Sequence, residues 1–432
     1  MNRQSALYLI LLLFSATVTG CLKDQCDETR TFIRFDPVYV SQVELDEPIE
    51  VEAPRQMINP GIIYFYKDYI LVSEFREGIH LINNEDPDNP MNEAFYRIQG
   101  SEHFAVISNQ LQVNKFNSLI TVDISDPQNP VEKFRVHNAF DEIWEDPSRG
   151  YLVYYRETEE TQVLDCSNPN FNSLRWSNVD RGGPIWIDLA VSERFDQANV
   201  SSTGSAVDQG SNSGVGGSTA RFTIAANHLY TVSDWNMKVF DLEDPCRPSL
   251  VNTVQVGWGI ETIYPFKDRL FIGSNAGMFV YDISDPVSPR FLTSFEHARA
   301  CDPVVADDDR AFVTLRDGTR CEGFNNQLDV IDISNITSPH LIKTYAMDHP
   351  HGLSLHDDVL YICEGKYGLK VFDASDSDQM KQIDHRKDLH AYDVIALSDS
   401  HILVIGRDGL YQFDASDPAR LEVISVIPVV QT

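Results

Sequence analysis

Long hydrophobic runs are scarce in this chain of 432 residues. A bilayer-spanning helix needs about 20 consecutive apolar residues, and the longest apolar run, from Leu7 to Ala16, is shorter than that. It lies near the N-terminus, and nothing later in the sequence approaches the spanning length. The sequence therefore excludes a protein with several membrane spans and predicts an exported body outside the bilayer.

Basic residues are also few. The chain has 34 Lys and Arg against 65 Asp and Glu, which gives a formal net charge of −31. Nucleic-acid binding needs a basic surface, so this balance excludes that class of partner. It also argues against electrostatic docking on anionic lipid. Cationic partners, neutral glycans and contacts mediated by Ca²⁺ stay open.

Motifs of known catalytic chemistry are missing. The sequence has no Gly-x-Ser-x-Gly elbow, no His-Glu-x-x-His pair and no EF-hand loop. Its seven cysteines show no Cys-x₂-Cys spacing, which excludes that type of zinc site. No catalytic residues are therefore predicted.

What the sequence does contain is one short phrase repeated eight times. The copy from Asp282 to Pro289 reads DISDPVSP and follows an apolar, β-prone segment. Asp and Ser hydrogen-bond their own backbone in tight turns, and proline ends strand pairing. The copies begin at Asn83, Asp123, Asp165, Asp241, Asp282, Asp332, Asp373 and Asp414. Most neighbouring copies lie about 41 residues apart, which is a period typical of repeat architectures.

Each repeat predicts four short strands. In one unit Val359–Ile362 and Leu369–Phe372 are the second and third strands, and the repeated phrase turns the third strand into the fourth. A single four-stranded sheet cannot bury both faces, so such repeats stack around an axis as blades. The predicted fold class is all-β, a β-propeller of eight four-stranded blades, with seven blades as the alternative. The units span residues 60–98, 102–136, 141–178, 220–255, 260–296, 301–346, 350–386 and 391–429.

The third strands resemble a known repeat family. Leu328–Asp332, Leu119–Asp123 and Leu369–Asp373 resemble the LVIVD repeat of bacterial and archaeal cell-surface proteins. The resemblance runs from about residue 60 to the C-terminus and departs at Asn83 and in residues 157–165. It implies a propeller on the cell surface and implies no catalytic residues.

The residues after the N-terminal apolar run resemble a bacterial lipobox. Val18–Cys21 ends in a small residue and a cysteine, and the resemblance implies cleavage before Cys21 and lipidation of that residue. Two or three acyl chains on one cysteine would anchor the protein firmly. An ordinary signal peptide is the alternative. The predicted location is the bacterial cell envelope, at the outer membrane or the cell surface, with the membrane as a partner through the lipid.

Three regions follow along the chain: a lipoprotein signal peptide (1–20), a lipidated tether with a lead-in strand (21–53) and the propeller (54–432). A Ser/Gly-rich insertion at about 197–219 has little apolar content and is expected to be a disordered or mobile loop. We expect Leu421–Ile427 to form the outer strand of the last blade. The strand-like segment Thr31–Val43 is expected beside it or beside the first blade.

One position at the start of the inner strands is acidic in most units. Inner strands line the axis of a propeller, so these side chains are expected to converge at one mouth of the central channel. The candidates are Glu102, Glu142, Glu261, Asp302, His351 and Asp393. Such a ring can hold a divalent cation, and without one mutual repulsion would raise the pKa of its carboxyls. The alternative is that these residues cap turns and bind nothing. No other cofactor is predicted.

Two further groups of residues each have two possible roles. His349 and His351 form a His-x-His pair that could ligate zinc, although Pro350 spoils a regular strand there, and the alternative is two exposed histidines. Trp186, Trp235 and Trp258 could stack on sugars, but packing between blades is the favoured interpretation.

Cysteines in an oxidising compartment can pair. Cys301 and Cys321 belong to loops that share one face of the same predicted unit, and Cys166 and Cys246 lie at repeated turns of neighbouring units on the opposite face. Two disulfides, Cys301–Cys321 and Cys166–Cys246, are therefore predicted.

Two functions remain. The first is a non-enzymatic surface lipoprotein whose propeller binds a protein or a glycan. The second is a propeller hydrolase or lyase that uses acids of the channel mouth, with or without a divalent metal. The second needs two carboxylates, or an acid and His351, about 5–10 Å apart in a deep pocket, and a plugged channel mouth would argue against it.

Overall fold

The computed structural model describes residues 27–140, 143–165, 185–188, 215–218, 221–275, 277–296, 303–316 and 326–431. The chain divides into unit 1, Met1–Pro37 with Tyr155–Glu193, and unit 2, Val38–Tyr154 with Arg194–Thr432. Within the described residues α2 (Gln42–Asp46) is the single helix, and all other regular elements are strands. The all-β prediction is confirmed. In that part of the chain no helix has the length and apolar character of a membrane span.

Unit 2 contains seven sheets whose four consecutive strands pair antiparallel in chain order. The first four sheets are β3 (Pro60–Tyr66), β4 (Tyr69–Glu74), β5 (Gly78–Asn83) and β6 (Met91–Arg97); β7 (Phe104–Ile107), β8 (Gln110–Lys115), β9 (Ser118–Asp123) and β10 (Val131–Val136); β15 (Phe222–Ala225), β16 (His228–Val232), β17 (Asn236–Asp241) and β18 (Ser249–Gln255); β19 (Ile260–Phe266), β20 (Arg269–Ser274), β21 (Gly277–Asp282) and β22 (Arg290–Glu296).

The last three sheets follow the same plan. They are β23 (Val304–Ala306), β24 (Arg310–Leu315), β25 (Gln327–Asp332) and β26 (His340–Ala346); β27 (Leu353–His356), β28 (Val359–Cys363), β29 (Leu369–Asp373) and β30 (Lys381–Arg386); β31 (Ala391–Ser398), β32 (His401–Gly406), β33 (Gly409–Asp414) and β34 (Glu422–Pro428). The prediction for Leu421–Ile427 is confirmed, because β34 is the outer strand of the last sheet. The first sheet also gains β2 (Glu50–Glu52) at its outer edge and β14 (Val215–Gly216) at its inner edge.

The eighth sheet has the order β11 (Trp144–Asp146), β12 (Gly150–Asp165), β1 (Asp27–Val40) and β13 (Ile185–Asp188). Its presence brings the described residues to eight sheets, the predicted number. The third repeat supplies β11 and β12, and β12 runs for 16 residues without the turn that would divide it into two strands of a blade. Its edge is taken by β1, so the expectation that Thr31–Val43 would lie beside the last or the first blade is wrong.

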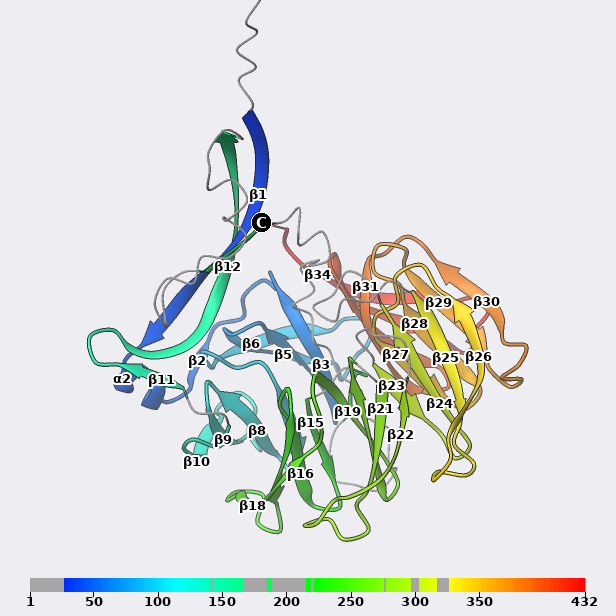
Figure 1. Ribbon diagram of the computed structural model, residues 1–432, viewed down its shortest axis with the longest axis horizontal. Helices are drawn as coiled ribbons and strands as arrows, with labels where there is room; N and C mark the ends of the chain where they lie inside the picture. Colours follow the sequence, from blue (N-terminus) through cyan, green and yellow to red (C-terminus); the bar gives the residue numbers. More distant parts are fainter. Residues whose placement is uncertain are drawn as a thin grey trace, which may run out of the picture. The chain divides into compact units, whose positions relative to one another are not determined.

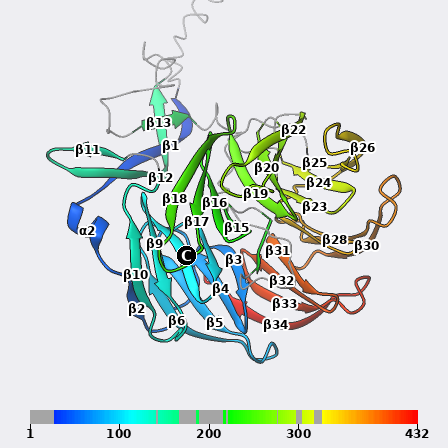
Figure 2. The same cartoon turned by 90° about the horizontal axis from the view of Figure 1, so that it is seen from below.

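The sheets of unit 2 follow one another around a closed ring (Figures 1 and 2). The inner strands of successive sheets contact each other from β7 to β15, β19, β23, β27 and β31. The first two sheets meet where Tyr64 packs on Phe104, and the last sheet meets the first where β32 contacts β3. This closed succession contains seven blades, which matches the alternative number, and the eighth sheet is the one described above. The propeller fold is confirmed.

The repeated phrase forms the same turn in every blade of this ring. Asp123 accepts hydrogen bonds at Oδ1 from the Ser125 amide at 2.9 Å and the Ser125 hydroxyl at 2.7 Å. The degenerate first copy forms the same turn, since Asn83 Oδ1 accepts a hydrogen bond from the Glu85 amide at 2.9 Å. A register shift follows in each pairing of third and fourth strands, and such bulges increase the local twist.

In five of the seven blades the turn also joins the blade to its neighbour. The carbonyl of its fifth residue accepts a hydrogen bond from a side chain of the preceding blade. The pairs are Tyr96 to Pro127 at 2.5 Å, Gln112 to Pro245 at 2.7 Å, Tyr230 to Pro286 at 2.9 Å, Tyr345 to Ser377 at 2.6 Å and Gln412 to Pro87 at 3.3 Å. The last pair links the final blade to the first. The repeat is therefore conserved along the chain because it makes both the turn and the joint.

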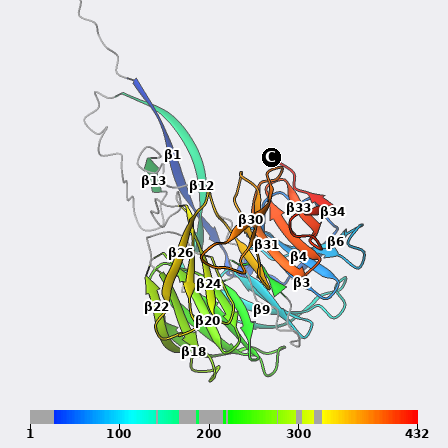
Figure 3. The ribbon, with the colours of Figure 1, turned by 90° about the vertical axis from the view of Figure 1, so that its right-hand side faces the viewer.

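The ring closes by packing, because no strand is exchanged between its first and last blades. Each of these blades takes its four strands from one end of unit 2, and Figure 3 shows the two lying side by side. Ile63, Ile70 and Val72 of the first blade share a buried cluster with Leu403 and Ile405 of the last. A backbone bridge between Met57 and Val429 adds to this contact.

Candidate functional site

The candidate ring residues lie where the chain enters the inner strands. Glu102 and His351 each lie one residue away from the start of β7 and β27, with His103 and Gly352 in between, and Glu261 and Asp393 lie on β19 and β31. Glu142 and Asp302 fall outside the described residues, as does Cys21. The topology places the four described residues at the same end of their sheets. The surroundings differ among Glu102, His351 and Asp393.

Glu102 is neutralised by an arginine of the neighbouring blade. Its carboxylate accepts a hydrogen bond from Arg76 Nε at 2.5 Å. The Arg76 guanidinium also lies over the ring of Tyr154, 4.0 Å from its centroid. A paired carboxylate of this kind needs no cation to relieve repulsion.

Asp393 is fully buried, and the end of the Ser/Gly-rich insertion covers it. Its Oδ1 accepts hydrogen bonds from the amide and the hydroxyl of Ser218, both at 3.3 Å. The Ser218 hydroxyl in turn accepts from the Leu353 amide at 2.7 Å. A Cβ on Gly352 would lie 1.9 Å from the Asp393 carboxylate, so only glycine allows this approach. Asp393 therefore anchors a loop inside the ring.

The segment that carries Ser218 is an additional inner strand. β14 pairs with β3 through Val215↔Phe65 and Gly216↔Tyr64, and it also contacts β31. Most of the predicted insertion lies outside the described residues, but Val215–Ser218 cross the inner edges of the first, sixth and seventh blades. This part of the channel mouth is filled by the protein's own chain.

His351 has a cationic neighbour instead of the expected acidic ones. Arg316 Nη1 lies 3.1 Å from His351 Nε2, and His349 Nδ1 lies 3.0 Å from the same nitrogen. Burial lowers the pKa of His351 well below its usual value, and the charges of Arg316 and the nearby histidines add to that shift. Gly365 has φ +53° and a Cβ there would meet His351 Nε2 at 2.8 Å, so the two rings pack only over glycine.

The alternative interpretation, two solvent-exposed histidines, is therefore wrong for His351, which is buried. The facing nitrogens of His349 and His351 could contribute two ligands to a metal. Within the described residues, a set of three metal-ligand side chains with donor atoms within 4.8 Å of one another occurs elsewhere, at His356, Asp357 and Asp399. Those residues lie in the hairpins at the other end of the sixth and seventh blades, where His356 Nε2 lies 2.5 Å from Asp399 Oδ1.

The sequence analysis missed two buried glutamates beside the channel mouth, Glu364 and Glu74, each of which binds a loop and a basic side chain. Glu364, fully buried, accepts from the amides of Asp348 at 3.0 Å and His349 at 2.6 Å and from Lys370 Nζ at 2.8 Å. Burial alone would lower the pKa of Lys370, but the hydrogen bonds that it donates to Asp348 and Glu364 raise its pKa above the usual value.

The first blade repeats the arrangement with Glu74. This carboxylate accepts from the Ile58 amide at 3.1 Å, from the Asn59 amide and from His80 Nε2 at 3.0 Å. Burial would raise the pKa of Glu74, but these hydrogen bonds lower it. In both blades a glutamate at the end of the second strand binds the incoming loop and a basic residue six positions later. That shared spacing was the signal available in the sequence.

The predicted disulfides receive no support. Cys246 is a free cysteine, so its proposed bond to Cys166 is not found, and Cys166 itself lies outside the described residues. Cys301 and Cys321 also lie outside them. Cys363 is free and buried, and burial raises the pKa of its thiol well above the usual value.

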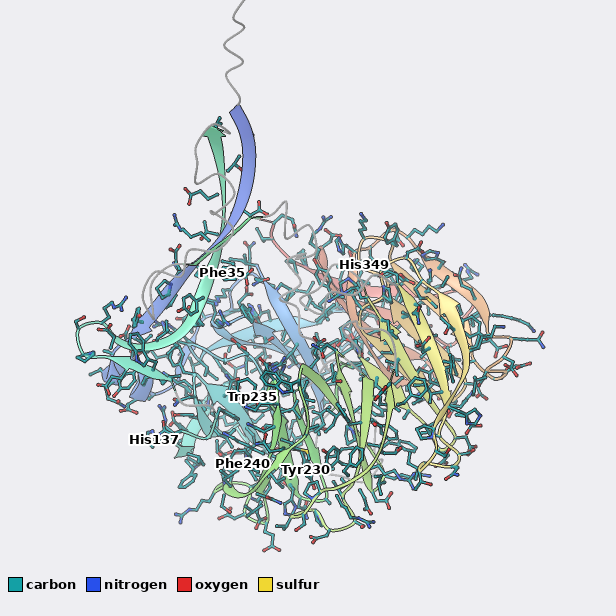
Figure 4. All side chains as sticks on the ribbon, in the orientation of Figure 1. Phe35, His137, Tyr230, Trp235, Phe240 and His349 are labelled. Atoms are coloured by element: carbon teal, nitrogen blue, oxygen red, sulfur yellow. The ribbon has the colours of Figure 1, made fainter. Side chains whose placement is uncertain are left out.

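The packing interpretation of two tryptophans is wrong. Trp235 and Trp258 are exposed, and Figure 4 labels the former. This prediction failed because both residues lie in loops beyond the strand ends, outside the packed faces of the blades. The side chain of Trp186 lies outside the described set.

Known proteins resemble this chain in two ways. A family model for the LVIVD repeat matches residues 105–138, 268–296 and 323–347, so the chain contains LVIVD repeats, as predicted. No curated protein matches it.

Several solved structures have a similar chain path. The computationally designed Ika8 protein is 10% identical with a TM-score of 0.49, covering 88% of this chain and 92% of that one. The periplasmic gluconolactonase PpgL of Pseudomonas aeruginosa is 10% identical with a TM-score of 0.48, covering 92% and 96%. BamB from Moraxella catarrhalis is 8% identical with a TM-score of 0.48, covering 87% and 98%. At these values the similarities say nothing about activity.

Proposed function

We propose that this protein, a propeller containing LVIVD repeats, is a surface-exposed lipoprotein and a non-enzymatic binding platform for a protein or glycan. The observation that carries the proposal is the difference between the two ends of its blades. At one end the blades repeat the same turn, and the turn carbonyls are hydrogen-bonded to the neighbouring blade. The other end carries loops that differ in each blade and are held by buried contacts. Rigidly presented, variable loops are where binding sites on such scaffolds are found.

The state of the channel acids favours binding over hydrolysis. Glu102 is paired with Arg76, and Asp393 is buried beneath Ser218. Paired-acid catalysis needs two carboxylates that reach one substrate, and neither of these two is available for that role. The proposed function requires no cofactor.

The lipid anchor is part of the same proposal and rests on the sequence around Cys21. A lipidated cysteine would hold the protein at the cell envelope and present the propeller away from the membrane. The acidic net charge of −31 suits a body that does not adhere to anionic lipid.

The experiment compares the wild-type chain with Cys21→Ser in the bacterial host. We expect wild type in the membrane fraction, sensitive to protease added to intact cells, and the variant in the soluble fraction. Cross-linking on intact cells followed by affinity capture should recover an envelope protein or glycan with the wild-type chain. A wild-type protein that stays soluble, or that is protected from external protease, would contradict the surface assignment. A capture that recovers neither class would contradict the platform.

A further inference from the structure

Two exposed tryptophans form a corner at the variable end of the third and fourth blades. Trp258 is 77% exposed and Trp235 is 41% exposed. Their ring centroids are 5.6 Å apart and their planes meet at 69°. Trp258 precedes β19 in the loop between the two blades, and Trp235 lies in the turn between β16 and β17. Large aromatic rings left in water in this way give up the burial that would stabilise the fold.

Backbone hydrogen bonds hold this corner in place. The Trp235 carbonyl accepts from the amides of Val256 at 3.0 Å and Gly257 at 3.4 Å, and the Asp234 carbonyl accepts from the Ile260 amide at 3.1 Å. A Cβ on Gly257 would lie 3.1 Å from the Phe279 ring, so the loop lies close against the blade. Both rings are therefore presented by a preorganised loop, which lowers the entropy cost of binding.

Polar groups border the corner. The Asp234 side chain, next to Trp235 in the chain, is 65% exposed and pairs with the Arg221 guanidinium at 3.1 Å.

These features select a carbohydrate. The C–H groups on the face of a pyranose ring pack on an indole, while its hydroxyls hydrogen-bond to carboxylate, amide and guanidinium groups. The net charge of −31 disfavours polyanionic glycans. A cationic peptide would need Asp234 as its counter-ion, and Arg221 already pairs with that residue.

We propose that Trp235 and Trp258 form a binding site for a neutral glycan of β-linked hexopyranose units. β-Linked units with equatorial hydroxyls present the flattest C–H faces for stacking. This inference rests on the proposed function and names the partner class of that platform.

The test titrates the full chain, purified in detergent, with cellohexaose, laminarihexaose and chitohexaose while tryptophan fluorescence is recorded. Polygalacturonate and oligolysine serve as the charged comparisons. We expect saturable binding of at least one neutral oligosaccharide and none of the polyanion. Trp258→Ala should weaken that binding at least tenfold without changing the melting temperature, because the side chain is exposed. Trp258→Tyr should retain part of the affinity, since stacking persists.

The control variant is Phe291→Ala. Phe291 is also exposed and also forms an edge-on pair, with Tyr281 at 5.7 Å, but it lies on the outer strand β22. Its removal should leave glycan binding unchanged. Binding that survives Trp258→Ala, absence of binding by all three oligosaccharides, or preference for oligolysine would each overturn the inference. Such a failure leaves the platform itself standing if surface capture still recovers a protein partner.

Discussion

At the scale of single residues, the mouth of the ring is organised by buried charges with dedicated partners. Glu364 and Glu74 each hold a basic side chain and two amides of the incoming loop. A buried carboxylate is stable only when such partners satisfy it. These residues are therefore positioned to fix loops and not to react with a substrate.

Replacing Glu364 by Ala should destabilise the protein strongly. The change leaves Lys370 half-paired and two loop amides without an acceptor, and breaking a buried pair costs about 3 kcal/mol. The free energy of unfolding, measured by urea titration, reports the loss. Asp348→Asn is the matched control, because Asp348 binds the same Lys370 from a half-exposed position and a pair of this kind contributes about 1 kcal/mol or less. Equal losses for the two variants would contradict this role of Glu364.

Two residue-scale features of the candidate site could not be predicted from the sequence. The position of Asp393 at the start of an inner strand could be predicted from the repeat. The burial of Asp393 beneath Ser218 could not be predicted. Ser218 is 175 residues away in sequence and lies in the gap between repeats, so no other repeat shows where it goes. The exposure of Trp258 depends on a loop of glycines whose path the strand pattern does not determine.

At the scale of elements, the turn after each third strand combines three tasks. Its first side chain closes the turn, its fifth carbonyl bonds to the preceding blade, and a bulge follows in the outer pairing. Hydrogen bonds from Ser125 hold the pKa of Asp123 at about 2. The period of the sequence predicted these turns and the strands between them. It could not show the joint, because the donors Tyr96 and Gln112 belong to no repeated phrase.

Replacing Asp123 by Ala should cost about 1 kcal/mol, the usual net value of a lost hydrogen bond. Asp123→Asn should cost less than half of that, because Asn83 performs the same function in the first blade. Thermal unfolding of the two variants beside wild type makes the comparison. If Asp123→Asn lowers the melting temperature as much as Asp123→Ala does, the carboxylate charge and its contact with Lys133 at 3.3 Å contribute more to stability than the turn hydrogen bonds.

At the scale of the whole molecule, ring closure explains why repeats that cannot stand alone form a stable body. Every blade in the ring covers one face of each neighbour, and the last covers the first. This architecture was predictable from the period of about 41 residues. The strand pairing of the third repeat was not predictable, because β12 pairs with β1, which comes from the N-terminal part of the chain and belongs to no repeat.

Stability of the whole protein should fall as the pH is lowered from about 6.5 to 4. Burial lowers the pKa of His103 to about 4, and it also lowers the pKa values of His351, His390 and His401. An unfolded histidine titrates near 6.5, so the unfolded chain binds more protons in this window. The free energy of unfolding must then decrease with decreasing pH.

Urea midpoints measured between pH 7.5 and 4.5 test this slope. The double variant His103→Asn and His351→Asn should flatten the curve, whatever its effect on stability at pH 7.5. The turn aspartates do not interfere, because the depressed pKa of Asp123 confines its loss of stability to pH values below about 4. A midpoint that is constant or rises on acidification contradicts the assignment.

The contact between the first and last blades also orders events during biosynthesis. Asn84 accepts a hydrogen bond from Gln412, 328 positions later in the chain. During synthesis, the face of the first blade that packs on the last one stays exposed to solvent until about the final forty residues have been made. A premature stop codon in the last repeat would therefore leave two apolar blade faces exposed, and not merely remove one blade.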